Sequence, residues 1–118
     1  MSAVAIAAVA ATAFNLVCSG TTTESSNGKP DKEASFHHVY HIDLDKRVWC
    51  IDECRWGIAP IMSVTQKEIN LLGGSDYEVF FDRETGRIVR ILGTLGDQEI
   101  DAGKCEQAPF TQFPEAKP

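Results

Sequence analysis

The chain has 118 residues, a formal net charge of −6 and four cysteines, and 43% of its residues are hydrophobic. This length corresponds to one small domain, because two domains could not each bury a sufficient core. With 11 basic residues against 17 acidic ones, the chain lacks the positive charge on which nucleic-acid binding depends. No stretch reaches the roughly 20 apolar residues that a membrane-spanning helix needs. Composition therefore argues against nucleic-acid partners and against an integral membrane segment.

The first 13 residues contain no charged side chain and are mostly Ala, Val and Ile. The apolar run Ala3–Ala11 has the length of a secretory hydrophobic region, and an Ala-Thr-Ala cleavage site ends at Ala13. We predict that residues 1–13 are a signal peptide cleaved after Ala13, and that residues 14–118 form a single domain in the periplasm or outside the cell. An Ala-rich helix packed on the domain is the structural alternative.

Cys18 suggests a second possible mode of export, by lipid attachment, because it follows soon after the apolar run. Lipid-attachment sites require a small residue directly before the cysteine, and Val17 is not small. Lipidation of Cys18 would also leave an odd cysteine in an oxidising compartment. A lipid-anchored envelope protein is therefore an alternative to the cleaved, exported chain.

The segment after the leader is expected to begin with a strand at residues 14–22, because Phe14, Leu16 and Cys18 alternate on one face. Residues 20–35 then collect Thr, Ser, Asn, Gly, Lys, Pro, Asp and Glu without a large apolar side chain. We predict that residues 20–35 are a flexible polar loop on the surface.

The remaining strands show alternation or short apolar runs and are separated by polar, Gly- or Pro-containing turns. They are expected at residues 36–44, 48–50, 59–65, 69–72, 77–81, 87–92 and 98–104. Residues 36–50 are expected to form a hairpin, and Gly86 is expected to close a second one, since glycine adopts the left-handed conformation at no steric cost. The proline-containing tail from Pro109 is expected to be irregular.

A series of about seven short strands without a helical period predicts an all-β fold, built as an antiparallel meander. The pattern leaves open whether the strands form a twisted open sheet or a small closed barrel, in which closure would remove the exposed edges.

The cysteines are even in number, and disulfides are the default state of cysteines in exported proteins. Three residues separate Cys50 from Cys54, a spacing that a tight turn brings within bridging distance. Cys18 and Cys105 lie near the two ends of residues 14–118, so a bond between them would tie the first strand to the last. We predict the disulfides Cys18–Cys105 and Cys50–Cys54, of which the first closes the longer loop and stabilises more.

Two chemical roles compete with a purely structural role for the Cys50–Cys54 pair. A redox pair has two intervening residues at the start of a helix, and here the acidic residues between the cysteines would disfavour the thiolate. A zinc site is the second possibility, because His37, His38 and His41 precede the pair closely. A strand with histidines on both faces is the preferred interpretation, so no metal and no cofactor are predicted; His37 and His41 are the alternative metal ligands.

Several short motifs are spread along the chain. They are Phe14-Asn15-Leu16-Val17-Cys18-Ser19-Gly20, Ile42-Asp43-Leu44-Asp45, Trp49-Cys50, Asp82-Arg83-Glu84-Thr85-Gly86, Gly103-Lys104-Cys105, Pro109-Phe110 and Phe113-Pro114. Together they resemble a group of small, uncharacterised exported proteins of alphaproteobacteria with a Phe-Asn-Leu-x-Cys-x-Gly mature N-terminus. The resemblance covers nearly all of residues 14–118 and implies export, a β-rich fold and paired cysteines. It implies no activity, ligand or catalytic residue.

The aromatic residues are numerous enough for one core in a domain of this size. The expected core aromatics are Tyr40, Trp49, Trp56, Phe80 and Phe81. Adjacent positions on a strand face opposite sides, however, so Phe80 and Phe81 cannot share one face. An exposed aromatic patch would instead indicate the binding of an envelope protein or a small apolar ligand.

Motifs of catalysis are missing from the sequence: it contains no Lys-bearing phosphate loop, no G-x-S-x-G and no H-E-x-x-H. Asp43 and Asp45 share a strand face, but an Asp-Leu-Asp run before a turn is typical of solvated turn residues. We therefore predict a noncatalytic binding or accessory domain of the cell envelope, with no catalytic residues. The alternative is a small secreted hydrolase or zinc-binding protein that uses His37, His38 and His41.

Overall fold

The computed structural model describes residues 12–74, 76–94 and 96–114. All regular secondary structure in these ranges is β-strand, and nine strands form a single antiparallel sheet. The strands are β1 (Ala13–Ser26), β2 (Lys29–Asp43), β3 (Val48–Ile51), β4 (Ala59–Pro60), β5 (Ser63–Val64), β6 (Glu68–Leu72), β7 (Tyr77–Asp82), β8 (Arg87–Thr94) and β9 (Asp97–Pro109). The predicted all-β, antiparallel fold is confirmed.

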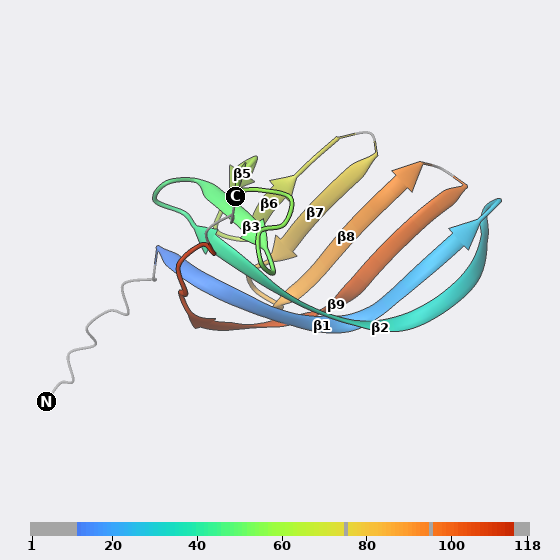
Figure 1. The fold of residues 1–118 in the computed structure, drawn as a ribbon, viewed down its shortest axis with the longest axis horizontal. Helices are drawn as coiled ribbons and strands as arrows, with labels where there is room; N and C mark the ends of the chain where they lie inside the picture. Colours follow the sequence, from blue (N-terminus) through green and yellow to red (C-terminus); the bar gives the residue numbers. More distant parts are fainter. Residues whose placement is uncertain (1–11, 75, 95, 115–118) are drawn as a thin grey trace, which may run out of the picture.

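The sheet consists of two meanders joined through the first and last strands. β1 to β4 pair in succession, β5 to β9 do the same, and β1 pairs with β9. The resulting order is β4-β3-β2-β1-β9-β8-β7-β6-β5. The sheet curls into a half-barrel, whose base is formed by β1, β2 and β9 (Figure 1). β4 and β5 are the outer strands, so the sheet is open, an arrangement that the strand pattern alone did not distinguish from a closed barrel.

The two edges of the curled sheet approach each other between β4 and β5. The backbone nitrogen of Ile61 donates to the carbonyl of Arg47, and that of Met62 donates to the carbonyl of Asn70, each over 2.9 Å. Arg47 directly precedes β3, whereas Asn70 lies on β6. Residues 61 and 62 therefore link the two arms of the half-barrel across its opening.

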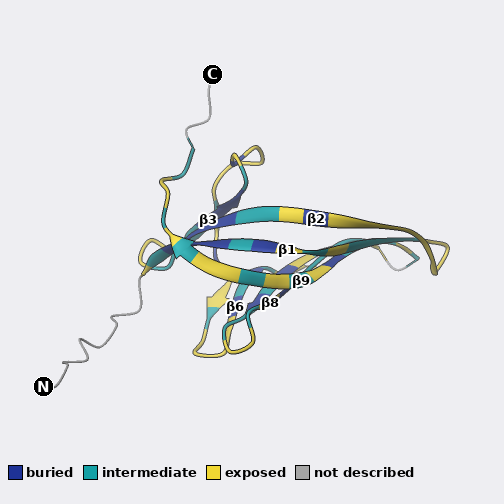
Figure 2. Ribbon diagram, turned by 90° about the horizontal axis from the view of Figure 1, so that it is seen from below, coloured by how far each residue is buried: buried dark blue, intermediate teal, exposed yellow. Residues whose placement is uncertain are grey.

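The prediction of a flexible polar loop at residues 20–35 is wrong. β1 and β2 run through this segment and pair from Ala13 with Asp43 to Ser26 with Lys29. The turn between them is Asn27-Gly28, in which φ is 55° and 78°, as the favoured two-residue hairpin turns require. This end of the hairpin is largely exposed (Figure 2), so neither of its faces needs apolar residues. Solvent exposure, and not the absence of a strand, explains the polar composition.

The core lies on one face of the curled sheet, which we call the inner face. Cross-strand pairs such as Leu16 with Tyr40 and Phe81 with Ile88 place apolar side chains together on this face. Its most deeply buried members are Leu16, Cys18, Tyr40, Ile42, Ile69, Leu71, Val79 and Ile88. Of the expected core aromatics, Tyr40, Trp49 and Phe81 are buried and Phe80 is partly buried. Trp56 is 81% exposed, so its expected place in the core is wrong.

Both predicted disulfides are confirmed: Cys18 is bonded to Cys105, and Cys50 to Cys54. Cys18 and Cys105 are direct cross-strand partners on β1 and β9. Disulfides persist in oxidising environments, so the two bonds indicate a non-cytoplasmic location for the folded chain. The first bond also engages the Cys18 sulfur that lipidation would require, which makes a lipid anchor at Cys18 incompatible with this pairing.

The predicted signal peptide falls largely outside the described residues, which begin at Thr12. The predicted cleavage site lies at the start of β1, because Ala13 is its first residue and pairs with Asp43. Cleavage after Ala13 would remove this terminal pair and the 2.7 Å bond from the Leu44 nitrogen to the Thr12 carbonyl. In the described ranges, no helix is long and apolar enough to cross a membrane.

Candidate functional site

An open hollow of about 410 Å³ lies between the two arms of the half-barrel. One wall comes from β3 and the segment that follows it, and the other from β6, β7 and β8. The lining residues are Trp49, Cys50, Ile51, Trp56, Gly57, Ala59, Leu72, Tyr77, Arg90 and Leu92. We call this the apolar hollow, because Arg90 is the one charged residue among the described residues that line it.

The turn after β3 shapes the rim of the apolar hollow. The Cys50–Cys54 disulfide closes this turn, and Asp52 and Cys54 have φ of 52° and 58°. The Gly57 nitrogen then donates to the Cys54 carbonyl over 2.9 Å. This sharp reversal leaves Trp56 against the hollow with 81% of its surface exposed, which is unusual for so large an aromatic side chain.

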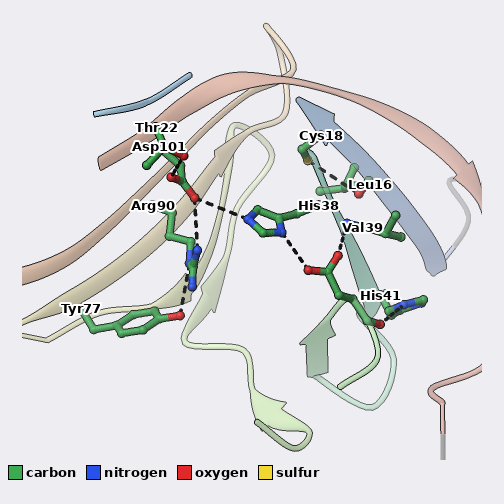
Figure 3. A network of polar contacts seen from close by, with 10 residues as sticks. Leu16, Cys18, Thr22, His38, Val39, His41, Tyr77, Arg90 and Asp101 are labelled. Carbon is green, nitrogen blue, oxygen red and sulfur yellow. Dashed lines mark hydrogen bonds and ion pairs between the residues drawn. The ribbon is translucent and has the colours of Figure 1, made fainter. Parts of the chain in front are cut away.

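Arg90 connects the apolar hollow to a network of polar contacts (Figure 3). Its Nη1 donates to Asp101 Oδ2 over 3.2 Å, and its Nε donates to the Tyr77 hydroxyl over 3.4 Å. The Thr22 hydroxyl donates to Asp101 Oδ1 over 2.5 Å, and His38 Nε2 lies 3.7 Å from Asp101 Oδ2. Asp101 is only 2% exposed, and these partners compensate the burial of its charge.

The strand register brings this network together. Asp101 on β9 pairs with Thr22 on β1 and with Arg90 on β8, so all three side chains share the inner face. Burial by itself lowers the pKa of Arg90, but the Tyr77 hydrogen bond and the nearby Asp101 carboxylate outweigh it and the pKa is raised. Arg90 is therefore a permanent cation. Burial raises the pKa of Tyr40 well above its ordinary value, so this phenol stays neutral.

A second hollow, of about 520 Å³, lies on the other side of Arg90. It is lined by Thr22, Glu24, Lys32, Glu33, Ala34, His38, Arg90, Glu99 and Asp101. We call it the polar hollow. Its four carboxylates outnumber its two basic residues, Lys32 and Arg90, so it presents an acidic surface. Arg90 lines both hollows and marks the boundary between them.

The three histidines that the zinc hypothesis invokes do not converge on a common point. His37 is exposed, and the side chain of His38 lies on the inner face, where its Nδ1 is 2.8 Å from Asp52 Oδ2. His41 Nε2 donates to the Asp52 carbonyl over 2.8 Å, and its Nδ1 lies 3.2 Å from the Thr111 hydroxyl. Both ring nitrogens of His41 are thus engaged. Among the described residues, no group of three or more His, Cys, Asp or Glu could hold a metal ion.

Asp52 is the residue on which two of these histidines meet, and sequence reasoning missed it. Its backbone nitrogen donates to the Val39 carbonyl over 2.7 Å, and its Oδ1 accepts from the Val39 nitrogen over 2.9 Å. Asp52 therefore continues the pairing of the β2 edge just beyond the end of β3. His38 holds its carboxylate and His41 its carbonyl, so these histidines fix the turn that carries Trp56.

The Cys50–Cys54 pair has the character of a structural crosslink. Cys50 is 2% and Cys54 is 5% exposed, whereas reactive cysteines are accessible to solvent. The arrangement as a whole offers a shaped apolar surface, one cation and a buried polar network, which are the elements of a binding site. No protein-family model, curated protein or solved structure matches the chain.

Proposed function

We propose that this protein is an exported, noncatalytic binding domain of the cell envelope, and that its apolar hollow holds a small, largely apolar ligand. The observation that carries the proposal is the hollow itself, with Trp49 and Trp56 in one wall and Tyr77 in the other. Its volume of about 410 Å³ lies in the range of ligand sites, roughly 300 to 1,000 Å³, which are mostly apolar with a few polar groups.

The exposure of Trp56 supports this proposal. An isolated domain gains stability by burying such a side chain, yet the disulfide-closed turn holds Trp56 at the rim of the hollow. A ligand in the hollow would cover part of the indole and would recover the free energy of that burial.

The noncatalytic part of the proposal rests on what the histidines do. His38 and His41 each form a hydrogen bond of 2.8 Å to Asp52. These ring nitrogens therefore stabilise the turn at Asp52, which is a structural role. The proposed export rests on the apolar run Ala3–Ala11 and the cleavage site that ends at Ala13, and it agrees with the oxidising environment that two disulfides require.

Binding can be tested with the neutral, environment-sensitive dye N-phenylnaphthylamine, titrated into the disulfide-bonded protein. We expect saturable binding with a gain in fluorescence, and a loss of affinity of up to about tenfold, or about 1.4 kcal/mol, in the Trp56→Ala variant. Met62→Ala is the matched control, because Met62 is 54% exposed but does not line the hollow. Absence of saturable binding, or an equal loss in the two variants, would contradict the proposal.

Export can be tested by expressing the full chain in a bacterium and measuring, by mass spectrometry, the molecular mass of the protein recovered from the periplasm. A mass equal to that of residues 14–118 with two disulfides is the expected result. An uncleaved chain retained in the cytoplasm would refute export, and a chain that starts at Cys18 with added acyl mass would establish the lipid-anchored alternative.

A further inference from the structure

We propose that Arg90 selects ligands of the apolar hollow that end in an anionic oxygen group, such as a carboxylate or a sulfonate. This inference rests on the proposed function and names the chemical class of the ligand. It follows from three features of Arg90: its position, its unused hydrogen-bond donors, and the distribution of charge on its two sides.

The position of Arg90 is at the boundary of the apolar hollow. Its side chain is 13% exposed and lies on the inner face of β8, between Val79 on β7 and Asp101 on β9. The other lining residues of the hollow are uncharged. A ligand that fills the hollow with an apolar body therefore meets one cation, and it meets that cation at a fixed place.

Arg90 has hydrogen-bond donors left over for a ligand. A guanidinium carries five N–H groups, of which Nε is used by Tyr77 and one on Nη1 by Asp101. Within the described part of the chain, Nη2 donates no hydrogen bond. An uncharged hydrocarbon in the hollow offers these donors no acceptor, whereas a carboxylate can accept from two donors at once.

The charge around Arg90 determines the side from which an anion can approach. Asp101 lies toward the polar hollow, where Glu24, Glu33 and Glu99 add further negative charge. An anionic group is repelled there. The apolar hollow contains no acidic lining residue among those described, and its low polarity strengthens the attraction between Arg90 and an anion. The charge pattern thus favours a ligand with its apolar body in this hollow and its anionic end against Arg90.

The test compares two dyes with the same aromatic body, anilinonaphthalene sulfonate and the uncharged N-phenylnaphthylamine. We expect the sulfonate to bind the disulfide-bonded protein about tenfold more tightly than the uncharged dye. Decanoate should likewise displace the bound uncharged dye at lower concentration than decanol, while naphthoate shows whether an aromatic body is accepted as well as an alkyl one. If alkyl and aromatic carboxylates displace the dye equally, the anionic group and not the body determines the preference, as proposed.

Variants of Arg90 attribute the preference to its side chain. Arg90→Met combined with Asp101→Asn removes both charges together, so that no buried charge is left unpaired. In this double variant we expect the two dyes to bind with about equal affinity, so that the preference for the sulfonate is lost. Arg90→Lys keeps the charge and its partner but loses the planar fork, and should retain part of the preference. Lys32→Met removes a cation outside the apolar hollow and should leave the preference unchanged.

The outcomes separate this inference from the proposed function. If the uncharged dye binds and the sulfonate binds no more tightly, the inference is overturned while the apolar hollow remains a ligand site. A preference that persists in the double variant Arg90→Met with Asp101→Asn, or that falls as much in Lys32→Met, overturns it too, because the contact with Arg90 is then not its cause. If neither dye binds, the proposed function is refuted, and the inference that rests on it is refuted as well.

Discussion

The indole nitrogen of Trp49 donates a hydrogen bond to the carbonyl oxygen of Leu71 over 3.0 Å. Trp49 lies on β3 and Leu71 on β6, strands that occupy positions near opposite edges of the sheet. Both residues are buried, so the bond is protected from water. This contact joins the two arms of the half-barrel through side chain and backbone together, and it lies beside the apolar hollow that the arms enclose.

Two substitutions of Trp49 should therefore separate the contribution of its hydrogen bond to stability from the contribution of its ring. Trp49→Phe keeps an aromatic ring but removes the donor, and should lower the free energy of unfolding by about 1 to 3 kcal/mol, because the Leu71 carbonyl stays buried without a partner. Trp49→Ala removes the ring as well and should lower it by about 3 to 5 kcal/mol. Urea unfolding followed by circular dichroism measures both. The exposed Trp56→Ala is the control, and a comparable loss there would disprove the assignment.

The Cys18–Cys105 disulfide should contribute more stability than the Cys50–Cys54 disulfide. The two bonds close separations of 87 and 4 residues, for which loop-closure entropy gives about 4.6 and about 1.9 kcal/mol. Replacing each pair with alanines and comparing urea unfolding of the two variants tests this order. An equal or reversed order would show that the chain-entropy account does not apply to this protein.

Gly20 and Gly103 allow β1 and β9 to cross closely next to the Cys18–Cys105 bond. They are direct cross-strand partners, and a Cβ on Gly20 would run into the Ala102 carbonyl oxygen and the Gly103 backbone. We expect Gly20→Ala to lower the free energy of unfolding by about 1 to 3 kcal/mol through overpacking. Gly73→Ala is the control, because its nearest contact would be the Asn70 amide at an ordinary 3.7 Å. Similar values for the two variants would rule out the close approach as the cause.

The parts of this fold that depend on local pattern could be predicted from the sequence. Alternation marked the inward-facing residues of the buried half of β2, and the turn at Gly86 marked the β7–β8 hairpin. The disulfide partners followed from spacing and from position near the ends of the domain. At residues 20–35 the same reasoning failed, because the strand residues there are polar or small and lie exposed or only partly buried, so they show no apolar alternation. The Asn27-Gly28 turn was the available signal.

The candidate site could not be predicted in the same way, because it depends on contacts between distant segments. The exposure of Trp56 results from the turn that His38 and His41 hold through Asp52, and the two hydrogen bonds involved span 14 and 11 residues. Arg90 meets Asp101 only because β8 and β9 pair in one particular register. A neighbouring register would have placed these two charges on opposite faces of the sheet.

Asp52 should stabilise the fold through its carboxylate more than through its backbone conformation. Asp52→Ala loses the bonds to His38 and to the Val39 nitrogen and places alanine at a φ of 52°, so a loss of about 2 to 4 kcal/mol is expected. Asp52→Gly relieves the backbone strain and should lose less, and Asp52→Asn retains an acceptor and should lose least. Glu53→Ala, at an exposed neighbouring position, is the control for urea unfolding. A variant order with glycine as stable as wild type would refute the role of the carboxylate.

Asp82 should make part of the stability depend on pH. The backbone N–H groups of Thr85 and Glu84 donate to its carboxylate and lower its pKa below the ordinary 3.8. A carboxyl with a lower pKa in the folded state binds protons more weakly there than in the unfolded state. Its stabilising contribution is therefore complete above pH 3.8 and is lost as the pH falls through the pKa of the folded state.

The Asp82→Asn variant separates this effect from the titration of other carboxyls. The amide still accepts hydrogen bonds in the β7–β8 turn but cannot titrate, so the free energy of unfolding should fall less steeply with decreasing pH than in the wild type. Urea unfolding at a series of pH values at and below 3.8 measures the two slopes. Asp45→Asn, in the exposed turn between β2 and β3, is the matched control. Identical slopes for the wild type and Asp82→Asn would show that the turn does not bind this carboxylate more tightly than water does.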